Sequence, residues 1–127
     1  LPYSPESKGS PVDLNDVADV ASLVLSERGH IGAIYELCGP DILTYYEQAI
    51  ILSECIDRSI YVEQVSLDEW KTQAYGVGLN AYSVESLAKM FSYYDSYGFW
   101  GSSHVLSTLL QRAPTSFIEF VKPHFSL

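Results

Sequence analysis

Residues 33–47, AIYELCGPDILTYYE, determine how the chain folds, because they join a short apolar segment to a turn and then to a helix start. Residues 33–37 are apolar and aromatic and are followed by a Gly-Pro pair, which is typical of a strand that leaves the core into a turn. Thr44 and Glu47 then have the spacing of a capping box, in which each side chain binds the backbone N–H of the other residue. The stretch therefore predicts a strand, a turn and a helix that ends near residue 56.

The pattern of apolar residues on either side predicts more elements of the same kinds. Before the quoted stretch, a helix is expected from a cap at Asp13 or Asn15 to Leu25, with apolar residues at helical spacing. After it, residues 60–65 are rich in β-formers and predict a second strand. Apolar stripes and caps predict four further helices, near residues 66–75, 84–97, 105–110 and 116–122, with Pro123 ending the last one.

This element order favours an α/β fold class that is mostly helical. Two or three short strands do not make a stable sheet alone, so they are expected to belong to the edge of a larger sheet, an α+β-like fragment with a helical cap. The 127 residues are the size of a single domain. Within it, residues 1–65 are predicted to form the sheet edge with its helices, and residues 66–127 the helical cap.

Composition excludes several classes of partner. Seven Lys and Arg face sixteen Asp and Glu, and the resulting charge of −9 repels nucleic acid and anionic membrane surfaces. The longest unbroken apolar run, Ala49–Leu52, is far shorter than a membrane span. The two cysteines, Cys38 and Cys55, have no metal-ligand spacing, and both are expected to be reduced and buried in a cytoplasmic protein. No metal site is predicted.

Motifs with known chemistry are few. Residues 76–81, GVGLNA, match the dinucleotide fingerprint GxGxxA, but they follow a predicted helix rather than a strand, so a glycine break between helices explains them better. None of the ten tyrosines is followed four residues later by Lys, the spacing of typical short-chain dehydrogenases. The catalytic residues are therefore unknown from the sequence.

Aromatic residues are dense between Tyr75 and Trp100, and they supply the candidate substrate pocket. Neighbours on a helix point about 100° apart, so consecutive tyrosines cannot share one core-facing stripe. At least two of the candidates are expected on one concave surface; ordinary packing or a subunit interface remains an alternative. The candidate pocket residues are Tyr93, Tyr94, Tyr97, Trp100 and His104.

Four segments taken together resemble the NmrA-like family of atypical short-chain dehydrogenases. They occur in the order found in that family and together span most of the chain. The segments are residues 11–18 (PVDLNDVA), 29–40 (GHIGAIYELCGP), 43–47 (LTYYE, followed by ILSE at 51–54) and 110–120 (LQRAPTSFIEF).

The resemblance is to the C-terminal portion of that family only. It implies that the strands are the edge of a Rossmann-type sheet and that the helical cap covers the substrate. The family's glycine-rich strand-turn-helix and its usual catalytic positions have no counterpart here. No cofactor is therefore expected on this chain alone, and NADP(H) is implied only if an N-terminal half is present. The positions that match the family motifs, Asp13, Asp16, Tyr35, Gly39 and Pro40, are scaffold positions.

Three functions remain open. The first is the substrate-binding half of an NmrA-like NAD(P)H-dependent oxidoreductase that acts on a small apolar or aromatic metabolite. The second is a shortened, cofactor-free isomerase, cyclase or dehydratase of secondary metabolism that uses the aromatic cap as a cavity. The third is a non-catalytic redox-sensing or protein-interaction domain. In each case the apolar side chains of the predicted strands, such as Ile34 and Val62, need a cover, either a missing N-terminal half or a homodimer partner.

Overall fold

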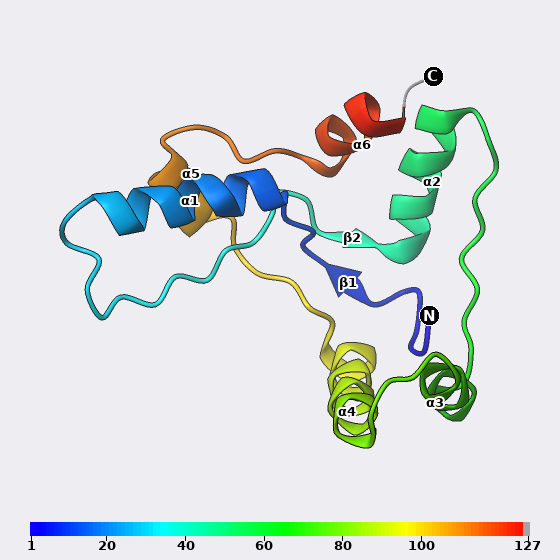
Figure 1. The fold of residues 1–127 in the computed structure, drawn as a ribbon. Coiled ribbons are helices and arrows are strands. Elements are labelled where there is room, and N and C mark those ends of the chain that lie inside the picture. The colour runs from blue at the N-terminus through cyan, green and yellow to red at the C-terminus, as the bar shows by residue number, and fades with distance from the viewer. Residues whose placement is uncertain (126–127) are drawn as a thin grey trace.

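The computed structural model describes residues 1–125, and within them six helices and two short strands follow one another along the chain (Figure 1). The elements are β1 Lys8–Gly9, α1 Leu14–Ser26, β2 Leu43–Thr44, α2 Tyr45–Ile56, α3 Leu67–Gly76, α4 Ala81–Tyr97, α5 His104–Leu110 and α6 Phe117–Phe125. The prediction of a mostly helical chain with little sheet is confirmed. No helix among the described residues is long and apolar enough to cross a membrane.

Helix starts follow the capping residues of the sequence. Asp13 caps α1 by accepting a hydrogen bond from the Asn15 N–H. Thr44 and Glu47 form the predicted capping box at α2, with the Thr44 N–H donating to Glu47 Oε2 at 2.7 Å. These bonds satisfy backbone donors that have no partner inside a helix, so α1 and α2 begin where the sequence supplies an acceptor.

One helix end was predicted wrongly. α6 continues past Pro123, which lies inside it. Proline removes one backbone donor, and the ring of His124 makes a 2.7 Å hydrogen bond to the Phe120 carbonyl in the same turn. That side-chain bond supports the last turn.

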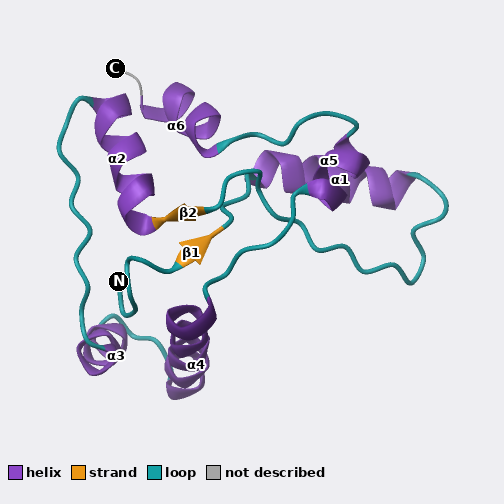
Figure 2. Cartoon of the chain, turned by 180° about the vertical axis from the view of Figure 1, so that it is seen from behind, coloured by secondary structure: helices purple, strands orange, loops and turns teal. Residues whose placement is uncertain are grey.

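The two strands predicted at residues 33–37 and 60–65 are not present as strands. Figure 2 shows both segments as loop, and the sheet consists of β1 and β2 alone, antiparallel, with Lys8 opposite Thr44 and Gly9 opposite Leu43. A strand is defined by a ladder of hydrogen bonds to a neighbouring segment. Residues 60–65 meet Leu1 at their end, where the Val65 N–H donates to the Leu1 carbonyl at 2.8 Å and the Leu1 amino group donates to the Glu63 carbonyl at 2.6 Å. These bonds do not extend into a ladder, and residues 33–37 join no ladder among residues 1–125. Ile34 is accordingly 97% exposed.

The helices form two groups on either side of the small sheet (Figures 1 and 2). α1 packs against α5 and α2 packs against α6, whereas α3 and α4 pack against each other. Residues 66–127 therefore contribute helices to both groups, because α5 and α6 return to the first half of the chain.

A buried carboxylate joins α1 to the segment before α6. Asp16 is 1% exposed and accepts hydrogen bonds from Arg112 Nη2 and from the Thr115 N–H, both at 2.7 Å. Arg112 also contacts the exposed Asp19 at 2.9 Å. Burial acts to raise the pKa of Asp16, but the Thr115 and Arg112 hydrogen bonds outweigh it and hold that pKa below its ordinary value.

The packed core is small for a chain of this length. Its fully buried side chains are Val84, Leu106, Val121 and Asp16. Large apolar side chains such as Leu25 and Ile31 lie in solvent. Both cysteines are free, but they are half-buried rather than buried as expected.

Candidate functional site

The site is built around the loop that follows α4. Gly98 ends the helix with φ 71° and ψ −174°, a conformation open to glycine, and its N–H donates to the Tyr94 carbonyl at 2.8 Å. Phe99 is held against β1, since its N–H donates to the Lys8 carbonyl at 2.7 Å and its carbonyl accepts from the Ser10 N–H at 3.0 Å. The loop is thereby fixed to the small sheet.

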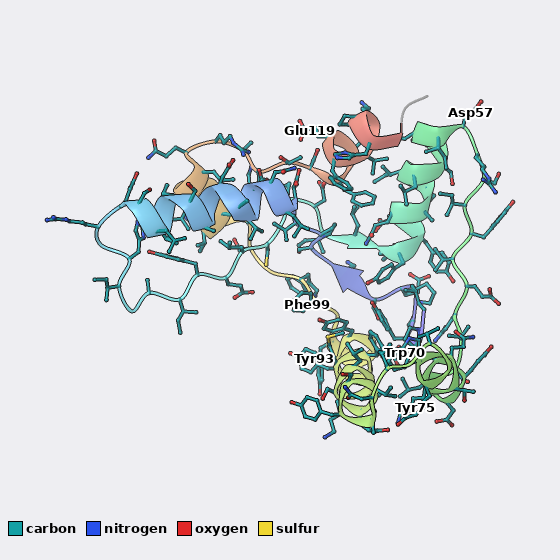
Figure 3. The ribbon with its side chains drawn as sticks, in the orientation of Figure 1. Asp57, Trp70, Tyr75, Tyr93, Phe99 and Glu119 are labelled. Carbon is teal, nitrogen blue, oxygen red and sulfur yellow. The ribbon has the colours of Figure 1, made fainter. Side chains whose placement is uncertain are left out.

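Beside this loop lies a hollow of about 500 Å³ with aromatic walls. The rings of Tyr93 and Tyr97, one helical turn apart on α4, are in contact, with their centroids 4.9 Å apart. Figure 3 shows Tyr93 on the side of α4 that faces away from α3, with Phe99 at the end of the helix that leads into the loop. The lining residues are Ser10, Val12, Glu36, Leu37, Cys38, Tyr93, Tyr97, Gly98, Phe99 and Trp100.

The aromatic side chains of this hollow are exposed to solvent. Tyr93 is 56% exposed, Tyr97 69% and Trp100 54%. A single exposed ring is ordinary, but a group of exposed rings on one surface is typical of a binding site or an interface. The hollow therefore has the composition of a site for a flat apolar molecule.

The opposite wall comes from the stretch after the predicted first strand. Glu36 and Cys38 lie against Gly101: a Cβ added at position 101 would come within 2.6 Å of Cys38 Sγ and 2.8 Å of Glu36 Oε1. The Cys38 thiol donates to Glu36 Oε1 at 3.8 Å. Burial and the neighbouring Glu36 charge raise the pKa of Cys38, so the thiol stays protonated at neutral pH.

A second, smaller hollow of about 230 Å³ lies beside the first, and the two share Ser10, Val12 and Phe99. Tyr3 is buried there, hydrogen-bonds the Tyr45 hydroxyl and stacks on Phe91 with ring centroids 5.5 Å apart. Burial, followed by the Tyr45 hydrogen bond, raises the pKa of Tyr3. Tyr3 therefore stays neutral and packs between the sheet and the α3–α4 pair.

The residues that the sequence predicted for the substrate pocket lie in three different places. Tyr93, Tyr97 and Trp100 line the large hollow. Tyr94 points to the other side of α4, lines the smaller hollow and contacts Tyr3 edge-on. His104 begins α5 on an exposed turn and does not line the large hollow.

Nothing in the sequence indicated that Glu36, Cys38 and Ser10 belong to the same wall. More than forty residues separate each of them from the start of α4. Ser10 is joined to the loop after α4 by hydrogen bonds to Phe99 and Gly101, and Glu36 and Cys38 lie against Gly101. Phe99 belonged to the aromatic run but was not among the candidate residues.

The described residues place the GVGLNA run outside the context of a dinucleotide fingerprint and bring together no metal-ligand group. The GVGLNA run lies between α3 and α4, with Gly76 inside the last turn of α3 and Asn80 capping α4, so it is not a turn between a strand and a helix. Within residues 1–125 there is no group of three or more His, Cys, Asp or Glu side chains that could hold a metal.

Comparison with known proteins finds several reductases among the proteins similar to this chain. No family model matches the chain. It is 26% identical over 119 residues, 94% of its length, to the NAD(P)H azoreductase of Xenophilus azovorans. The structure is similar to that of the NADPH-dependent quinone oxidoreductase of Escherichia coli, with a TM-score of 0.79, 26% identity and 98% of this chain covered. It is also similar to the triphenylmethane reductase of a Citrobacter species, with a TM-score of 0.73, 27% identity and 93% coverage.

The chain spans less than half the length of these relatives. It covers 42% of the azoreductase, 46% of the quinone oxidoreductase chain and 41% of the triphenylmethane reductase chain. All three are named as reductases, and those whose names give a cofactor are NAD(P)H-dependent, which agrees broadly with the class implied by the NmrA-like resemblance.

Proposed function

We propose that residues 1–127 form the substrate-binding part of an NAD(P)H-dependent reductase that acts on a small aromatic or otherwise unsaturated apolar molecule. The observation that carries this proposal is the large hollow, in which exposed aromatic side chains of α4 and its following loop face the segment at Glu36. The class of reaction comes from the relatives, which are reductases of quinones, azo compounds and triphenylmethane dyes by name.

In this proposal the chain's own residues bind and orient the substrate, which is the acceptor of the reducing equivalent. Tyr93, Tyr97 and Trp100 supply flat apolar area with polar edges, which holds a planar molecule in one orientation. Ser10 and Cys38 supply hydroxyl and thiol donors at the opposite wall. In the proposal the reducing equivalent comes from a nucleotide bound by another part of the protein, because the GVGLNA run lies between two helices and not between a strand and a helix.

The uncovered apolar segments support the same proposal. Ile31 and Ile34 are fully in solvent, and residues 33–37 and 60–65 carry the side chains of strands without strand neighbours. A nucleotide-binding half that adds parallel strands would bury these side chains and give their backbone groups partners. A homodimer is the alternative cover.

The test uses the full-length protein that contains residues 1–127. NADPH oxidation is followed with a naphthoquinone, an azo dye and a triphenylmethane dye, and the double variant Tyr93→Ala/Trp100→Ala is compared with Tyr82→Ala, which changes an exposed ring of α4 outside the hollow. We expect turnover in the wild type and in the control, and a large rise in KM in the double variant. Turnover of an acceptor without nucleotide would favour the cofactor-free isomerase or cyclase, and nucleotide binding without turnover would favour a regulator. Either result overturns the proposal.

A further inference from the structure

The charge of the large hollow points to a more specific substrate class. Among its ten lining residues Glu36 is the only one with a charged side chain, and it is a carboxylate. Lys8, which lies nearby on β1, lines the smaller hollow and not this one. The chain as a whole carries a charge of −9, so its long-range electrostatic potential is negative, as is the potential close to Glu36.

The carboxylate is held close to the aromatic loop. Gly101 leaves room for it, since any side chain there would meet Glu36 Oε1 at 2.8 Å and Cys38 Sγ at 2.6 Å. The Gly101 N–H in turn donates to Ser10 Oγ at 3.2 Å, which fixes the loop that carries Phe99 and Trp100. Glu36 is thus one wall of a hollow whose other walls are the rings of α4 and its loop.

Aromatic rings together with a carboxylate form a site for an organic cation. The face of an aromatic ring carries negative electrostatic potential and attracts a cation, most strongly for tryptophan. A carboxylate at the rim adds a direct charge interaction. A planar acceptor with an anionic sulfonate or carboxylate meets repulsion from Glu36 and finds no cation among the lining residues to offset it.

We infer that the hollow selects planar aromatic cations over neutral and anionic acceptors of the same size, with Glu36 as the residue that sets this preference. This inference rests on the proposed function, because it concerns which acceptor the same site binds. The part played by Glu36 is in binding the acceptor's charge rather than in the chemical step.

Equilibrium dialysis with the full-length protein tests the inference directly. The probes are a cationic triarylmethane dye, a sulfonated, net-anionic dye with the same ring skeleton, and a neutral naphthoquinone. We expect the cationic dye to bind about fivefold more tightly than the neutral probe, because one exposed ion pair together with cation–π contacts contributes a binding free energy of that magnitude. The anionic dye should bind most weakly. Rising ionic strength should reduce this difference, since Glu36 is exposed.

The substitution Glu36→Gln keeps the shape of the side chain and removes its charge. It should reduce the preference for the cation to what the cation–π contacts alone supply, while leaving the affinity for the naphthoquinone unchanged. The matched control is Glu63→Gln, which removes one negative charge from residues 60–65, a segment that does not line the hollow. An equal reduction of the preference in both variants would assign it to net charge and would overturn the role of Glu36.

The outcomes separate this inference from the proposed function. Equal affinity for all three probes, or a preference that is as large in Glu36→Gln as in the wild type, overturns the inference while NADPH-dependent turnover of the naphthoquinone still supports the reductase. Absence of turnover with every acceptor overturns the proposed function itself. A preference reduced in Glu36→Gln alone supports the inference.

Discussion

Tyr93 and Tyr94 have different roles, because adjacent residues on a helix point about 100° apart. Tyr94 packs against Tyr3 and, with ring centroids 4.9 Å apart, against Phe99, whereas Tyr93 faces the large hollow. We expect Tyr94→Ala to lower the free energy of unfolding by about 3 kcal/mol, because it leaves a gap between α4 and the sheet. Tyr93→Ala should leave stability nearly unchanged and weaken acceptor binding. Urea unfolding and dialysis of both variants check this, and equal destabilisation would show that the two rings are both core.

Asp16 is the single residue on which the junction of α1 with the C-terminal segment depends. Asp16→Asn places an amide where Thr115 and Arg112 both donate, so we expect the free energy of unfolding to fall by about 3 kcal/mol. The matched control, Asp19→Asn, changes an exposed partner of the same Arg112 and should have no measurable effect.

The same carboxylate gives a pH dependence whose sign follows from its lowered pKa. A carboxylate with a folded-state pKa below the unfolded value of about 4 contributes its full stability above that value and loses it as the pH falls through the folded-state pKa. Acid titration of the free energy of unfolding should therefore show a steeper decline below about pH 4 in the wild type than in Asp16→Asn. Parallel curves would contradict this.

At the scale of the elements, the end of α4 determines where the aromatic loop goes. A Cβ at Gly98 would lie 2.7 Å from the Lys8 carbonyl, and its φ of 71° is itself strained for other residues. We expect Gly98→Ala to cost about 2 kcal/mol or more of stability and to weaken acceptor binding by displacing Phe99 and Trp100. In Gly76→Ala, at the end of α3, the added methyl meets nothing within 4 Å, so unfolding and binding should stay close to wild type. Similar losses in both variants would argue against a special role for this turn.

Element starts were predictable from the sequence where local chemistry fixes them, as the caps Asp13 and Thr44 show. Residues 33–37 and 60–65 were predicted as strands and are loops, because a strand depends on a neighbouring strand whose presence residue propensity does not reveal. The aromatic side of the large hollow could be inferred from tyrosine density on one helix. Glu36 could not, since its place in the wall depends on contacts between distant segments.

On the scale of the whole molecule, the exposed apolar face formed by Ile31 and Ile34 is a feature that mutation can test. Ile34→Lys places a charge on a side chain that is 97% exposed in residues 1–125. If another part of the full-length protein covers that face, the substitution should lower its thermal midpoint by several degrees, because it buries an unpaired charge. Tyr82→Lys, at a residue 84% exposed on α4, should change little. Equal, negligible shifts in both variants would show that the face stays in solvent.

The pairing of α1 with α5 and of α2 with α6 also has a consequence during synthesis. A ribosome adds about 5–20 residues per second, so α5 and α6, which pack against α1 and α2, are synthesised several seconds after them. During that interval the nascent chain presents the apolar stripes of two unpartnered helices, the kind of surface that chaperones bind. Folding is therefore delayed until the last segment emerges, and a premature stop codon before α5 leaves a polypeptide whose first helices never acquire their partners.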